Sequence, residues 1–451
     1  MSGFIPHLRK SGAGLDRSWG RFTALGGPAI ERTAATAAAR VRDVVRQAVS
    51  PSEYRALVLI GGYGRGEGGV LSTPQGERLH NNMDLLLILR GRHARLKEHT
   101  MARLRAGMDD VEKAFEIGVD FTTQSESHLR RAPCLVMWYD MRCGHKTLAG
   151  DPDMVPGMSH FRRAAILPSD VRNLLVNRAA LLLLNDFILD CHDGSELQRR
   201  AMVKHVAKAI VGYGDAVLFF SGLYHWSYLE KRRRMRGLST VSAQFRRLYD
   251  QASAFRLAPD YEALHVRNPR SWMQDLERAM EPVHLSCERA RLGLPDLDWH
   301  DYGRVALRHA LLEAPFEPRR TARKLRHLLS PAPTAGSSLH GRSGGLIDRT
   351  ASRAADMREL AAVALPAVLY PRARAAAATQ AGEILGARSR EPRELRRAFL
   401  RTWRTAADPN LDLALERLGI EADQLLGDRA VTPSAPRASG LFPTPTTQGV
   451  E

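Results

Sequence analysis

The sequence predicts an α+β protein, with a small mixed β-sheet domain near the N-terminus followed by a larger all-helical region. Two short apolar runs and one segment of alternating residues, all between residues 55 and 125, have the length and bounding turn residues typical of strands. From about residue 161 onward, long stretches carry apolar residues at helical spacing, and no strand candidate lies between them. A chain of 451 residues that is 44% apolar is long enough for two or three hydrophobic cores.

The elements of the sheet domain are expected in a definite order. Residues 29–49 are rich in alanine and predict a helix. The predicted strands are "RALVLI" (55–60), "MDLLLIL" (83–89) and "IGVDFTTQS" (117–125), and a second helix is expected over residues 91–114.

Two further segments belong to this domain. The segment "CLVMWYDMRCGHKTLAGDPDM" (134–154) predicts a strand, a turn and a short strand that ends near Leu148. Residues 71–81, "LSTPQGERLHN", contain turn formers and leave no room for a long helix.

Composition suggests six parts along the chain. They are an N-terminal arm (1–28), the domain with the sheet (29–157), a helical domain (158–330), a flexible linker or loop rich in Gly, Ser and Pro (331–349), a C-terminal helical segment (350–430) and a disordered tail (431–451).

The net charge of +17 is strongly basic. Such a charge attracts nucleic acid or another polyanion. The alternative is that most arginines lie on solvated helix faces. Few aromatic residues are interleaved with the basic runs, so a base-stacking surface is not indicated. The runs "EKRRRMR" (230–236) and "RRTARKLRHLL" (319–329) are interpreted as solvated helix ends, with RNA or DNA binding as the alternative.

The cysteines and the apolar runs bear on the compartment. The four cysteines are scattered without a Cys-x-x-Cys pair, which favours reduced thiols over a disulfide framework or a zinc site: Cys134, Cys143, Cys191 and Cys287. The first twenty residues lack the apolar run of a signal peptide. The most apolar later stretch (173–190) is too short and too charged to span a bilayer. A cytoplasmic protein with no membrane partner is expected.

The stretch "LVLIGGYGRGEGGV" (57–70) has six glycines among fourteen residues, directly after the first predicted strand. Dense glycine lets the backbone approach a ligand closely. A P-loop is excluded, because Gly61 and Gly66 are correctly spaced but Glu67 and Gly68 stand where Lys and Ser/Thr are needed.

Two other phosphate-binding loops also fail. Gly64, Gly66 and Gly69 spell the dinucleotide fingerprint, but the next predicted strand begins near residue 83 and leaves no room for the crossover helix. A kinase loop needs a strand lysine and a His-Arg-Asp motif, and both are missing from the sequence.

A fourth interpretation uses all three predicted strands. A Gly-Gly turn follows the first, Asp84 opens the second, and Asp120 lies on the third. Carboxylates that hold a divalent metal for a nucleotide must converge from neighbouring strands. An acid at the mouth of a buried apolar strand, as Asp84 is expected to be, is costly unless it is paired or bound to metal.

This order resembles the nucleotidyltransferase superfamily, whose members have a polymerase-β-like fold. The matching residues are Gly61 and Gly62, then "NNMDLLLIL" (81–89), then Asp120 in "GVDF". The sequence "GGYGRGEGG" followed by Asn-x-x-Asp-Leu-Leu-Leu looks like a bacterial subgroup of that superfamily. The later "WYDMRCGHKTLAGDPDM" is similar to the end of such a domain, so the resemblance covers roughly residues 30–155.

The resemblance implies an enzyme that moves a nucleoside monophosphate from an NTP to an acceptor. ATP is the default NTP, and the acceptor would be RNA, a protein or a small molecule, with the basic charge favouring a polyanion. Gly61, Gly62 and Arg65 would hold the triphosphate, and Glu67 is a further candidate for nucleotide binding or metal ligation.

The same resemblance assigns the metal ligands. Asp84, together with Asn82, would hold Mg²⁺ or Mn²⁺. Asp120 would hold the metal that lowers the pKa of the acceptor hydroxyl and would help to remove its proton.

The sequence departs from the family at position 82, where Asn replaces the first metal-binding Asp. Asn82 is a weak ligand in a slow or specialised enzyme, or Glu67 or His80 compensates, or the domain binds nucleotide without turning it over. Two other function classes therefore stay open: a catalytically degenerate nucleotide-binding regulatory module, and a basic nucleic-acid-binding protein.

Several candidates also have structural interpretations. Arg65 would be a solvated loop arginine, Glu67 a surface acid or a partner of Arg65, Asp120 part of a structural pair, and Asn82 a turn residue. In the helical region, five polar residues are expected mainly in the core, with Asp215 as a candidate for an acceptor pocket: Tyr213, Asp215, Tyr224, His225 and Tyr228.

Overall fold

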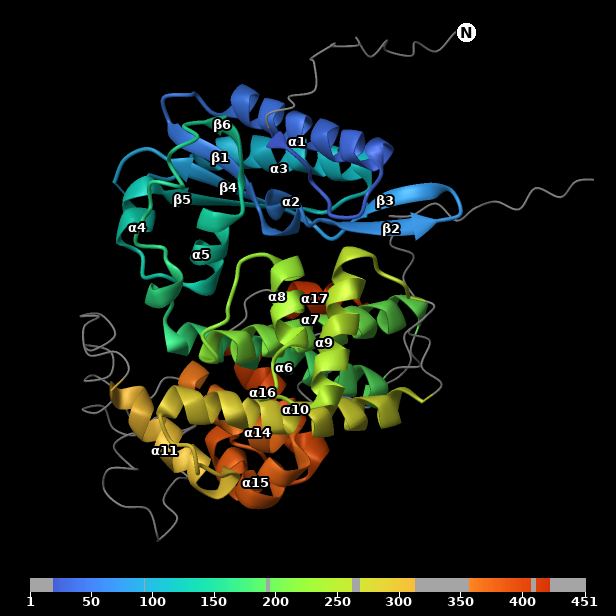
Figure 1. Cartoon of the computed structure of the whole chain (residues 1–451), viewed down its shortest axis with the longest axis vertical. Coiled ribbons are helices and arrows are strands. Elements are labelled where there is room, and N and C mark those ends of the chain that lie inside the picture. Colours follow the sequence, from blue (N-terminus) through green and yellow to red (C-terminus); the bar gives the residue numbers. More distant parts are fainter. Residues whose placement is uncertain are drawn as a thin grey trace, which may run out of the picture. The chain divides into compact units, whose positions relative to one another are not determined.

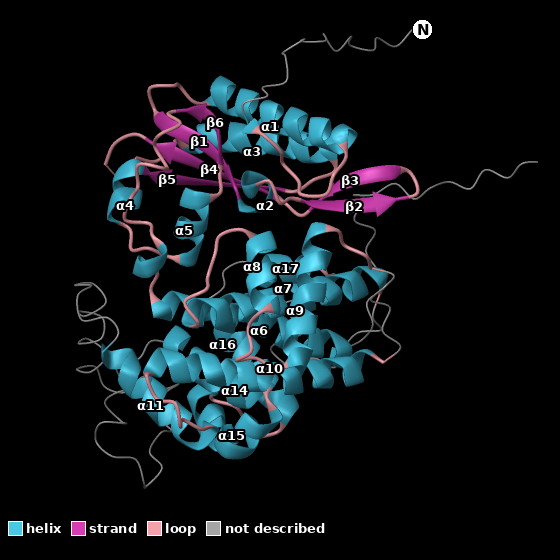
Figure 2. Ribbon diagram, in the orientation of Figure 1, coloured by secondary structure: helices cyan, strands magenta, loops and turns pink. Residues whose placement is uncertain are grey.

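The computed structural model describes residues 19–92, 94–191, 195–261, 268–312, 357–406 and 411–421. The predicted linker (331–349), the predicted tail (431–451) and the basic run 319–329 lie outside these ranges. Among the described residues, an N-terminal mixed sheet with its helices is followed by a large all-helical region, which confirms the predicted fold class (Figures 1 and 2).

Four strands form the main sheet, in the order β5-β4-β1-β6. Their bounds are Tyr54–Ile60 (β1), Met83–Leu89 (β4), Val119–Ser125 (β5) and Lys146–Gly150 (β6). β1 is antiparallel to β4 and to β6, whereas β4 and β5 are parallel. Parallel strands in register begin at the same edge of the sheet, so the first residues of β4 and β5 lie side by side.

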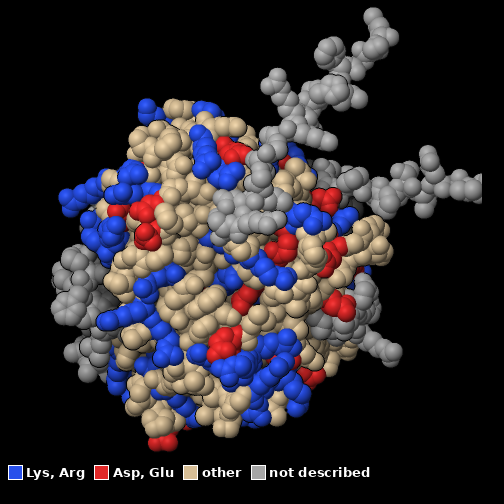
Figure 3. All heavy atoms as spheres, turned by 45° about the horizontal axis from the view of Figure 1, so that its top comes forward, with Lys and Arg blue, Asp and Glu red and all other residues tan. Residues whose placement is uncertain are grey.

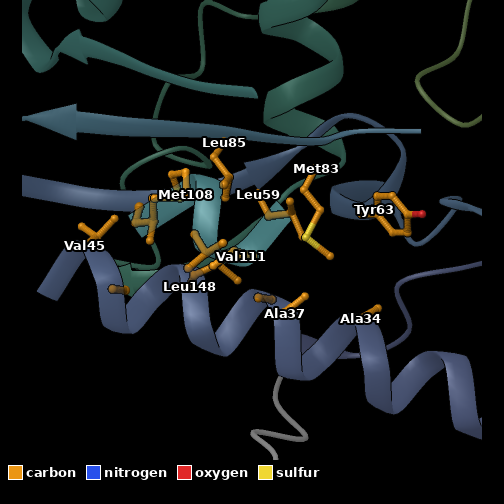
Figure 4. Close-up of a cluster of buried hydrophobic side chains, with 14 of the residues drawn as sticks. Ala34, Ala37, Val45, Leu59, Tyr63, Met83, Leu85, Met108, Val111 and Leu148 are labelled. Atoms are coloured by element: carbon orange, nitrogen blue, oxygen red, sulfur yellow. The ribbon is translucent and has the colours of Figure 1, made fainter. Parts of the chain in front are cut away.

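Helices α1 (Pro28–Ala48) and α3 (Glu98–Phe115) cover one face of this sheet (Figure 1). Side chains alternate between the faces of a strand, and the odd-numbered positions of β4 point into the core under these helices. Figure 4 draws part of this core, with Ala34, Ala37, Leu59, Met83 and Leu85 among its labelled members. The even-numbered positions of β4, which include Asp84, therefore point to the opposite face.

The predicted strands and the first helix are confirmed, with small shifts at their ends. The second helix is correct in type but begins at Glu98 instead of near residue 91. The last predicted strand of the domain corresponds to β6.

Residues 136–143 correct the prediction of a strand within 134–154. They form helix α5 (Val136–Cys143), which buries Trp138, Tyr139 and Met141. A short apolar run bounded by turn residues fits a buried strand and a buried helical turn equally well, so periodicity cannot decide between them.

Residues 71–81 hold more structure than the predicted turns. β2 (Gly69–Thr73) and β3 (Gly76–His80) form a separate two-stranded hairpin, with Pro74 and Gln75 at its tip. The turn residues were recognised, but the charged stretch Gly76–His80 carries no apolar alternation that would indicate a strand.

Short helices complete the first part of the chain: α2 (Gly61–Arg65) and α4 (Glu126–Arg131). The remaining helices are α6 (Pro168–Cys191), α7 (Glu196–Phe220), α8 (Tyr228–Arg236), α9 (Ala243–Leu257), α10 (Pro269–Leu292), α11 (Trp299–Leu312), α14 (Met357–Leu369), α15 (Pro371–Leu385), α16 (Pro392–Ala406) and α17 (Leu411–Arg417). None of the helices within the described ranges is both long and apolar enough to cross a membrane.

The chain forms two compact units. The first comprises Met1–Arg178, His205–Arg267 and Arg278–Leu297, and the second comprises Ala179–Lys204, Asn268–Glu277 and Asp298–Glu451. The sheet and the helical residues that surround the candidate site all belong to the first unit. The six parts expected from composition stay a prediction.

Candidate functional site

The register of the sheet brings the two predicted acids together. Asp84 is the Cα partner of Ile60 on β1 and of Asp120 on β5. Both acids are at even-numbered positions near the start of their strands, on the face that α1 and α3 leave uncovered. Sequence order alone predicted this convergence, and the parallel pairing of β4 with β5 provides it.

Gly61 follows β1 directly and lies against Asp84. Its φ is +66°, and a Cβ at this position would lie 1.8 Å from Oδ2 of Asp84. Any larger residue would therefore displace the carboxylate, besides adopting a backbone conformation that side chains disfavour. Gly61 and Gly62 open the short helix α2 at the end of β1.

Asn82 lies just before β4, and its side-chain amide contacts the second acid. Nδ2 of Asn82 donates a hydrogen bond of 2.7 Å to Oδ2 of Asp120. Both side chains are exposed. At position 82 the structure therefore has a neutral hydrogen-bond donor to Asp120.

The carboxyl group of Asp84 is in an unusual electrostatic environment. Burial raises its pKa to about 6, and the negative charge of Asp120 acts in the same direction. The positive charges of Arg256, Arg65 and Lys208 oppose this rise. Asp84 is half-buried, and a carboxylate that is partly removed from water beside a second carboxylate is stabilised by a cation that binds between them.

The carboxylate oxygens at the start of β4 and β5 suit a hard cation that is also bound by a phosphate. Mg²⁺ in proteins is commonly held by one or two carboxylates together with substrate phosphates and water, and Asp84 and Asp120 supply two carboxylates. No group of three or more His, Cys, Asp or Glu side chains that could hold a metal is found in the described part of the chain. The residues thus fit a metal shared with a ligand, and they do not form an all-protein cage.

Arg65 is buried and paired, so the interpretation as a solvated loop arginine is wrong. Its side chain is 6% exposed, and Nη1 lies 3.3 Å from Oδ2 of Asp140 on α5. Its guanidinium carbon is 4.9 Å from the ring centroid of Tyr228. Nε of Arg65 is buried and has no hydrogen-bond partner among the described residues.

Arg256 on α9 has a similar environment. Its guanidinium carbon lies 4.2 Å from the ring centroid of Tyr228, and its buried Nε also lacks a hydrogen-bond partner within the described ranges. Arg256 and Lys208, on α7, are the charged neighbours of Asp84 that sequence reasoning missed. A single basic residue in a helix of an arginine-rich chain carries no local signal that could have identified it.

Glu67 is buried and contacts the beginning of α8, so the interpretation as a surface acid is wrong. It is 5% exposed. Its carboxylate accepts hydrogen bonds from Oγ of Ser227 (2.5 Å) and from the backbone N–H groups of Tyr228 (2.8 Å) and Leu229 (3.4 Å). Both oxygens of Glu67 therefore have protein partners at the N-terminus of a helix, where negative charge is stabilised.

His80, the other residue considered as compensation for Asn82, is also buried. Its Nε2 lies 3.0 Å from the hydroxyl oxygen of Tyr261. The side chains of Glu67 and His80 thus contact residues at the start of α8 and after the end of α9.

In the helical residues of the first unit, Asp215 is buried and paired. Nζ of Lys231 lies 2.9 Å from its Oδ2, and the hydroxyl of Tyr249 donates to its Oδ1 at 3.2 Å. Tyr213 and Tyr224 are buried too, whereas His225 and Tyr228 are half-buried. The predicted solvated helix end 230–236 is corrected at Lys231, whose side chain is fully buried.

Comparison with known protein families, with curated proteins and with solved structures finds no match to this chain. The family resemblance therefore depends on the motif residues and their order. The α+β architecture, with a small mixed N-terminal sheet and a helical remainder, does not depend on that resemblance.

Proposed function

We propose that this protein is a metal-dependent nucleotidyltransferase, which moves a nucleoside monophosphate from an NTP to an acceptor. The main observation behind the proposal is that Asp84 lies beside Asp120 at the start of two adjacent parallel strands. Gly61 is in close contact with Asp84. The motif order along the chain supports the same function.

The phosphates of the NTP would lie between the acids and the cations that surround Asp84. Arg65 and Arg256 each keep a buried Nε–H without a hydrogen-bond partner among the described residues. These N–H groups suit phosphate oxygens, which form strong charge-assisted hydrogen bonds with guanidinium groups. Lys208 would add a third positive charge near Asp84.

Asp84 and Asp120 would hold Mg²⁺ or Mn²⁺ jointly with the triphosphate. When bound, the ion would neutralise phosphate charge and lower the pKa of the acceptor hydroxyl. Asp120 is exposed, and would accept the proton of that hydroxyl. Asn82 would orient Asp120 through its hydrogen bond to Oδ2.

A second candidate function is a nucleotide-binding module without turnover. The hydrogen bond from Asn82 to Asp120 favours it, because an amide at position 82 offers no negative charge to a second cation. Both candidates require the same NTP site, and they differ in whether the α-phosphate is transferred.

The described basic residues give less support to a nucleic-acid-binding protein. In the run 230–236, Lys231 is buried and the arginines pair with Glu230 or Asp250. On the face drawn in Figure 3, acidic side chains lie among the basic ones. RNA stays in the proposal as one class of acceptor.

The test incubates the full-length protein with a bacterial extract, Mg²⁺ and each NTP labelled at either the α- or the γ-phosphorus. The proposal predicts that label from the α-position enters an acceptor, that label from the γ-position does not, and that EDTA abolishes transfer. Asp84→Ala and Asp120→Ala should each reduce labelling by at least about a hundredfold, because the site then loses a carboxylate that acts on the transition state.

The matched control is Asp109→Ala, which removes an exposed acid from α3 of the same domain. It should label the acceptor at the wild-type rate. NTP binding without transfer would favour the non-catalytic module. Labelling that is unchanged in Asp84→Ala would exclude this site as the catalytic centre.

A further inference from the structure

A chain of buried polar side chains leads from the glycine-rich loop into the helices of the first unit. Its links are Arg65 Nη1 to Asp140 Oδ2 (3.3 Å), Tyr224 Oη to Asp140 Oδ1 (3.0 Å), Lys231 Nζ to Tyr224 Oη (3.0 Å), Lys231 Nζ to Asp215 Oδ2 (2.9 Å) and Tyr249 Oη to Asp215 Oδ1 (3.2 Å). These residues come from α2, α5, α7, α8, α9 and the segment before α8. We call this set the buried network.

The buried network is almost closed to solvent and balanced in charge. The side chain of Lys231 is 0% exposed, those of Arg65 and Asp215 are each 6% exposed, and that of Asp140 is 12% exposed. Two cations and two carboxylates alternate along it. Burial raises the pKa of Asp140, and the positive charges of Lys231 and Arg65 act against that rise.

Stability alone does not explain such an arrangement. Removing charges from water costs several kcal/mol for each ion, and apolar residues of similar volume are often equally or more stabilising. The network does determine one geometric property. Asp140 binds Nη1 of Arg65, and the buried Nε has no hydrogen-bond partner among the described residues, so the orientation of this guanidinium, whose charge acts on Asp84, depends on residues outside the glycine loop.

Helix α8 contacts the same loop at a second point. Glu67 accepts hydrogen bonds from the backbone at the start of α8, and the ring of Tyr228 lies against both Arg65 and Lys231. The distance from Nζ of Lys231 to that ring centroid is 4.4 Å. Residues 65 to 67 are thus held by α8 through two sets of contacts, one of which is the buried network.

We propose that Asp140, Lys231 and Asp215 are positioning residues, which fix the guanidinium of Arg65 beside Asp84 so that it binds the polyphosphate of a nucleotide. The inference rests on the proposed function and adds to it a role for residues that touch neither the phosphates nor the metal. Its ligand class is a polyphosphate, with or without a nucleoside.

The first experiment is a double-mutant cycle on the full-length protein. Isothermal titration calorimetry measures the affinity for inorganic tripolyphosphate with Mg²⁺, and for the α,β-methylene analogue of ATP, in wild type, Arg65→Ala, Asp140→Asn and the double variant. Arg65→Ala should weaken tripolyphosphate binding by about tenfold or more, and Asp140→Asn by a similar factor. If Asp140 acts through Arg65, the double variant should bind as weakly as Arg65→Ala alone.

A merely structural role of Asp140 would give additive losses, and that result would overturn the inference. The charge-removing substitution Asp140→Asn keeps the size of the side chain and an acceptor for Tyr224. The same titrations with adenosine, which has no phosphates, should show no difference between wild type and Asp140→Asn.

The second experiment replaces the deeper ion pair by apolar residues, in the variant Lys231→Met/Asp215→Leu. The variant should melt cooperatively, yet bind tripolyphosphate about tenfold more weakly. Arg233→Ala, on an exposed position of α8 whose side chain is 73% exposed, is the matched control and should bind as wild type. A folded double variant with wild-type affinity would contradict the inference.

The proposed function and the positioning role can be disproved separately. If wild type binds neither tripolyphosphate nor the α,β-methylene analogue of ATP, GTP, CTP or UTP, the proposed function is wrong and the inference is wrong with it. If wild type binds these ligands and the losses in the cycle are additive, only the positioning role is wrong.

Discussion

Asn82 is the residue at which the candidate site departs from the family that it resembles. Its amide donates a hydrogen bond to Asp120, so position 82 stabilises the carboxylate of that acid and adds no negative charge of its own. Asp84 and Asp120 remain the only two carboxylates of the predicted metal set. The effect of having Asn instead of Asp at position 82 can be measured by changing that residue alone.

Asn82→Asp should make the protein depend on divalent cations. Without them, the new carboxylate loses the hydrogen bond to Asp120 and repels it, so the melting temperature in EDTA should fall. Millimolar Mg²⁺ should restore it, and the Mg²⁺ affinity should rise by about tenfold or more because a third charge attracts the ion. Thermal unfolding with and without Mg²⁺ measures both effects.

Asn81→Asp is the control, since it adds the same charge one residue away on an exposed side chain. Equal effects of Mg²⁺ on the two variants would show that position 82 does not contact a metal. A large gain in nucleotidyl transfer by Asn82→Asp would indicate that the natural site is attenuated.

Gly61→Ala tests the close approach of the loop to Asp84. A Cβ at this position would meet Oδ2 of Asp84 at 1.8 Å, and φ is +66°. Gly222 has a similar φ of +72° but open space around the position of a Cβ. Gly222→Ala therefore measures the backbone cost alone, and Gly61→Ala should lower the free energy of unfolding by about 1–3 kcal/mol more.

Urea denaturation of both variants makes this comparison. Equal losses of stability would mean that the loop does not press against the carboxylate. A further variant, Gly61→Ala/Asp84→Ala, should recover part of the loss because it removes the group that clashes.

Residue-scale prediction from the sequence succeeded where the signal was local. Gly61 follows an apolar run, Asp84 lies at the start of another, and Asp120 lies in a segment of alternating residues, so their approximate positions on the sheet could be predicted. The burial of Arg65 and Glu67 could not be predicted, because their partners Asp140 and Ser227 are distant in sequence and belong to other elements.

At the scale of elements, Glu67 connects the glycine-rich loop with α8. Glu67→Gln should lower the free energy of unfolding by about 2–3 kcal/mol, because the amide nitrogen of Gln cannot accept the hydrogen bonds that backbone N–H groups donate to a buried carboxylate. Urea denaturation measures the loss. Glu230→Gln, on α8 itself and with a side chain that is 24% exposed, is the control and should change stability much less.

If the two substitutions proved equally mild, the start of α8 would not depend on Glu67. If Glu67→Gln also abolished NTP binding while remaining folded, the contact between the loop and α8 would be part of the binding site.

A pair of acids in the second unit predicts a pH-dependent stability. Glu277 on α10 is buried near Asp186 on α6, and burial raises the pKa of Glu277 to about 8, with the charge of Asp186 acting in the same direction. Arg374 and Arg396 oppose this rise. Since the pKa in the folded state is above the ordinary 4.5, the folded state binds the proton more tightly than the unfolded state.

The stabilisation from this proton is complete below about pH 4.5 and is lost as the pH rises towards about 8. Glu277→Gln cannot ionise and should remove that loss. The melting temperature of wild type should therefore fall relative to the variant between pH 5 and pH 8.5, whereas Glu391→Gln, at an exposed position, should follow wild type. Parallel curves for wild type and Glu277→Gln would contradict the prediction.

Element prediction succeeded for long apolar patterns and failed for short ones. The strands β1 and β4 are nearly continuous apolar runs, and their type was predicted correctly. The helix α5 has eight residues, too few for its period to be distinguished from that of a strand. The strands β2 and β3 pair through their backbones, and Val70 and Leu79 are buried, but five-residue strands with one or two apolar residues each carry no periodicity that predicts them.

At the scale of the whole molecule, the candidate site combines residues from both halves of the first unit. The acids and glycines lie within residues 30–155, which the family resemblance covers. Arg256, Lys208 and the inner part of the buried network lie beyond it, in the helices. Residues 30–155 expressed alone would therefore lack three of the cations whose charges act on Asp84 and Asp140, namely Arg256, Lys208 and Lys231.

The net charge of +17 gives little information about a ligand. Many arginines in the described helices pair with acids, such as Arg396 with Asp186 and Arg404 with Asp412. Composition counts charges without regard to their partners, so the polyanionic ligand that it suggests stays a prediction.

The most direct test of the account is the binding of Mn²⁺, followed by electron paramagnetic resonance, in the presence of α,β-methylene NTP analogues. Wild type should bind Mn²⁺ tightly only when an analogue is present, because two carboxylates and the phosphates must share the ion. Asp84→Asn and Asp120→Asn should each abolish this binding, and Asp109→Asn should leave it unchanged. Failure of wild type to bind Mn²⁺ with any of the four analogues, or Mn²⁺ binding that survives both substitutions, would contradict the central claim that Asp84 and Asp120 form a metal-dependent nucleotide site.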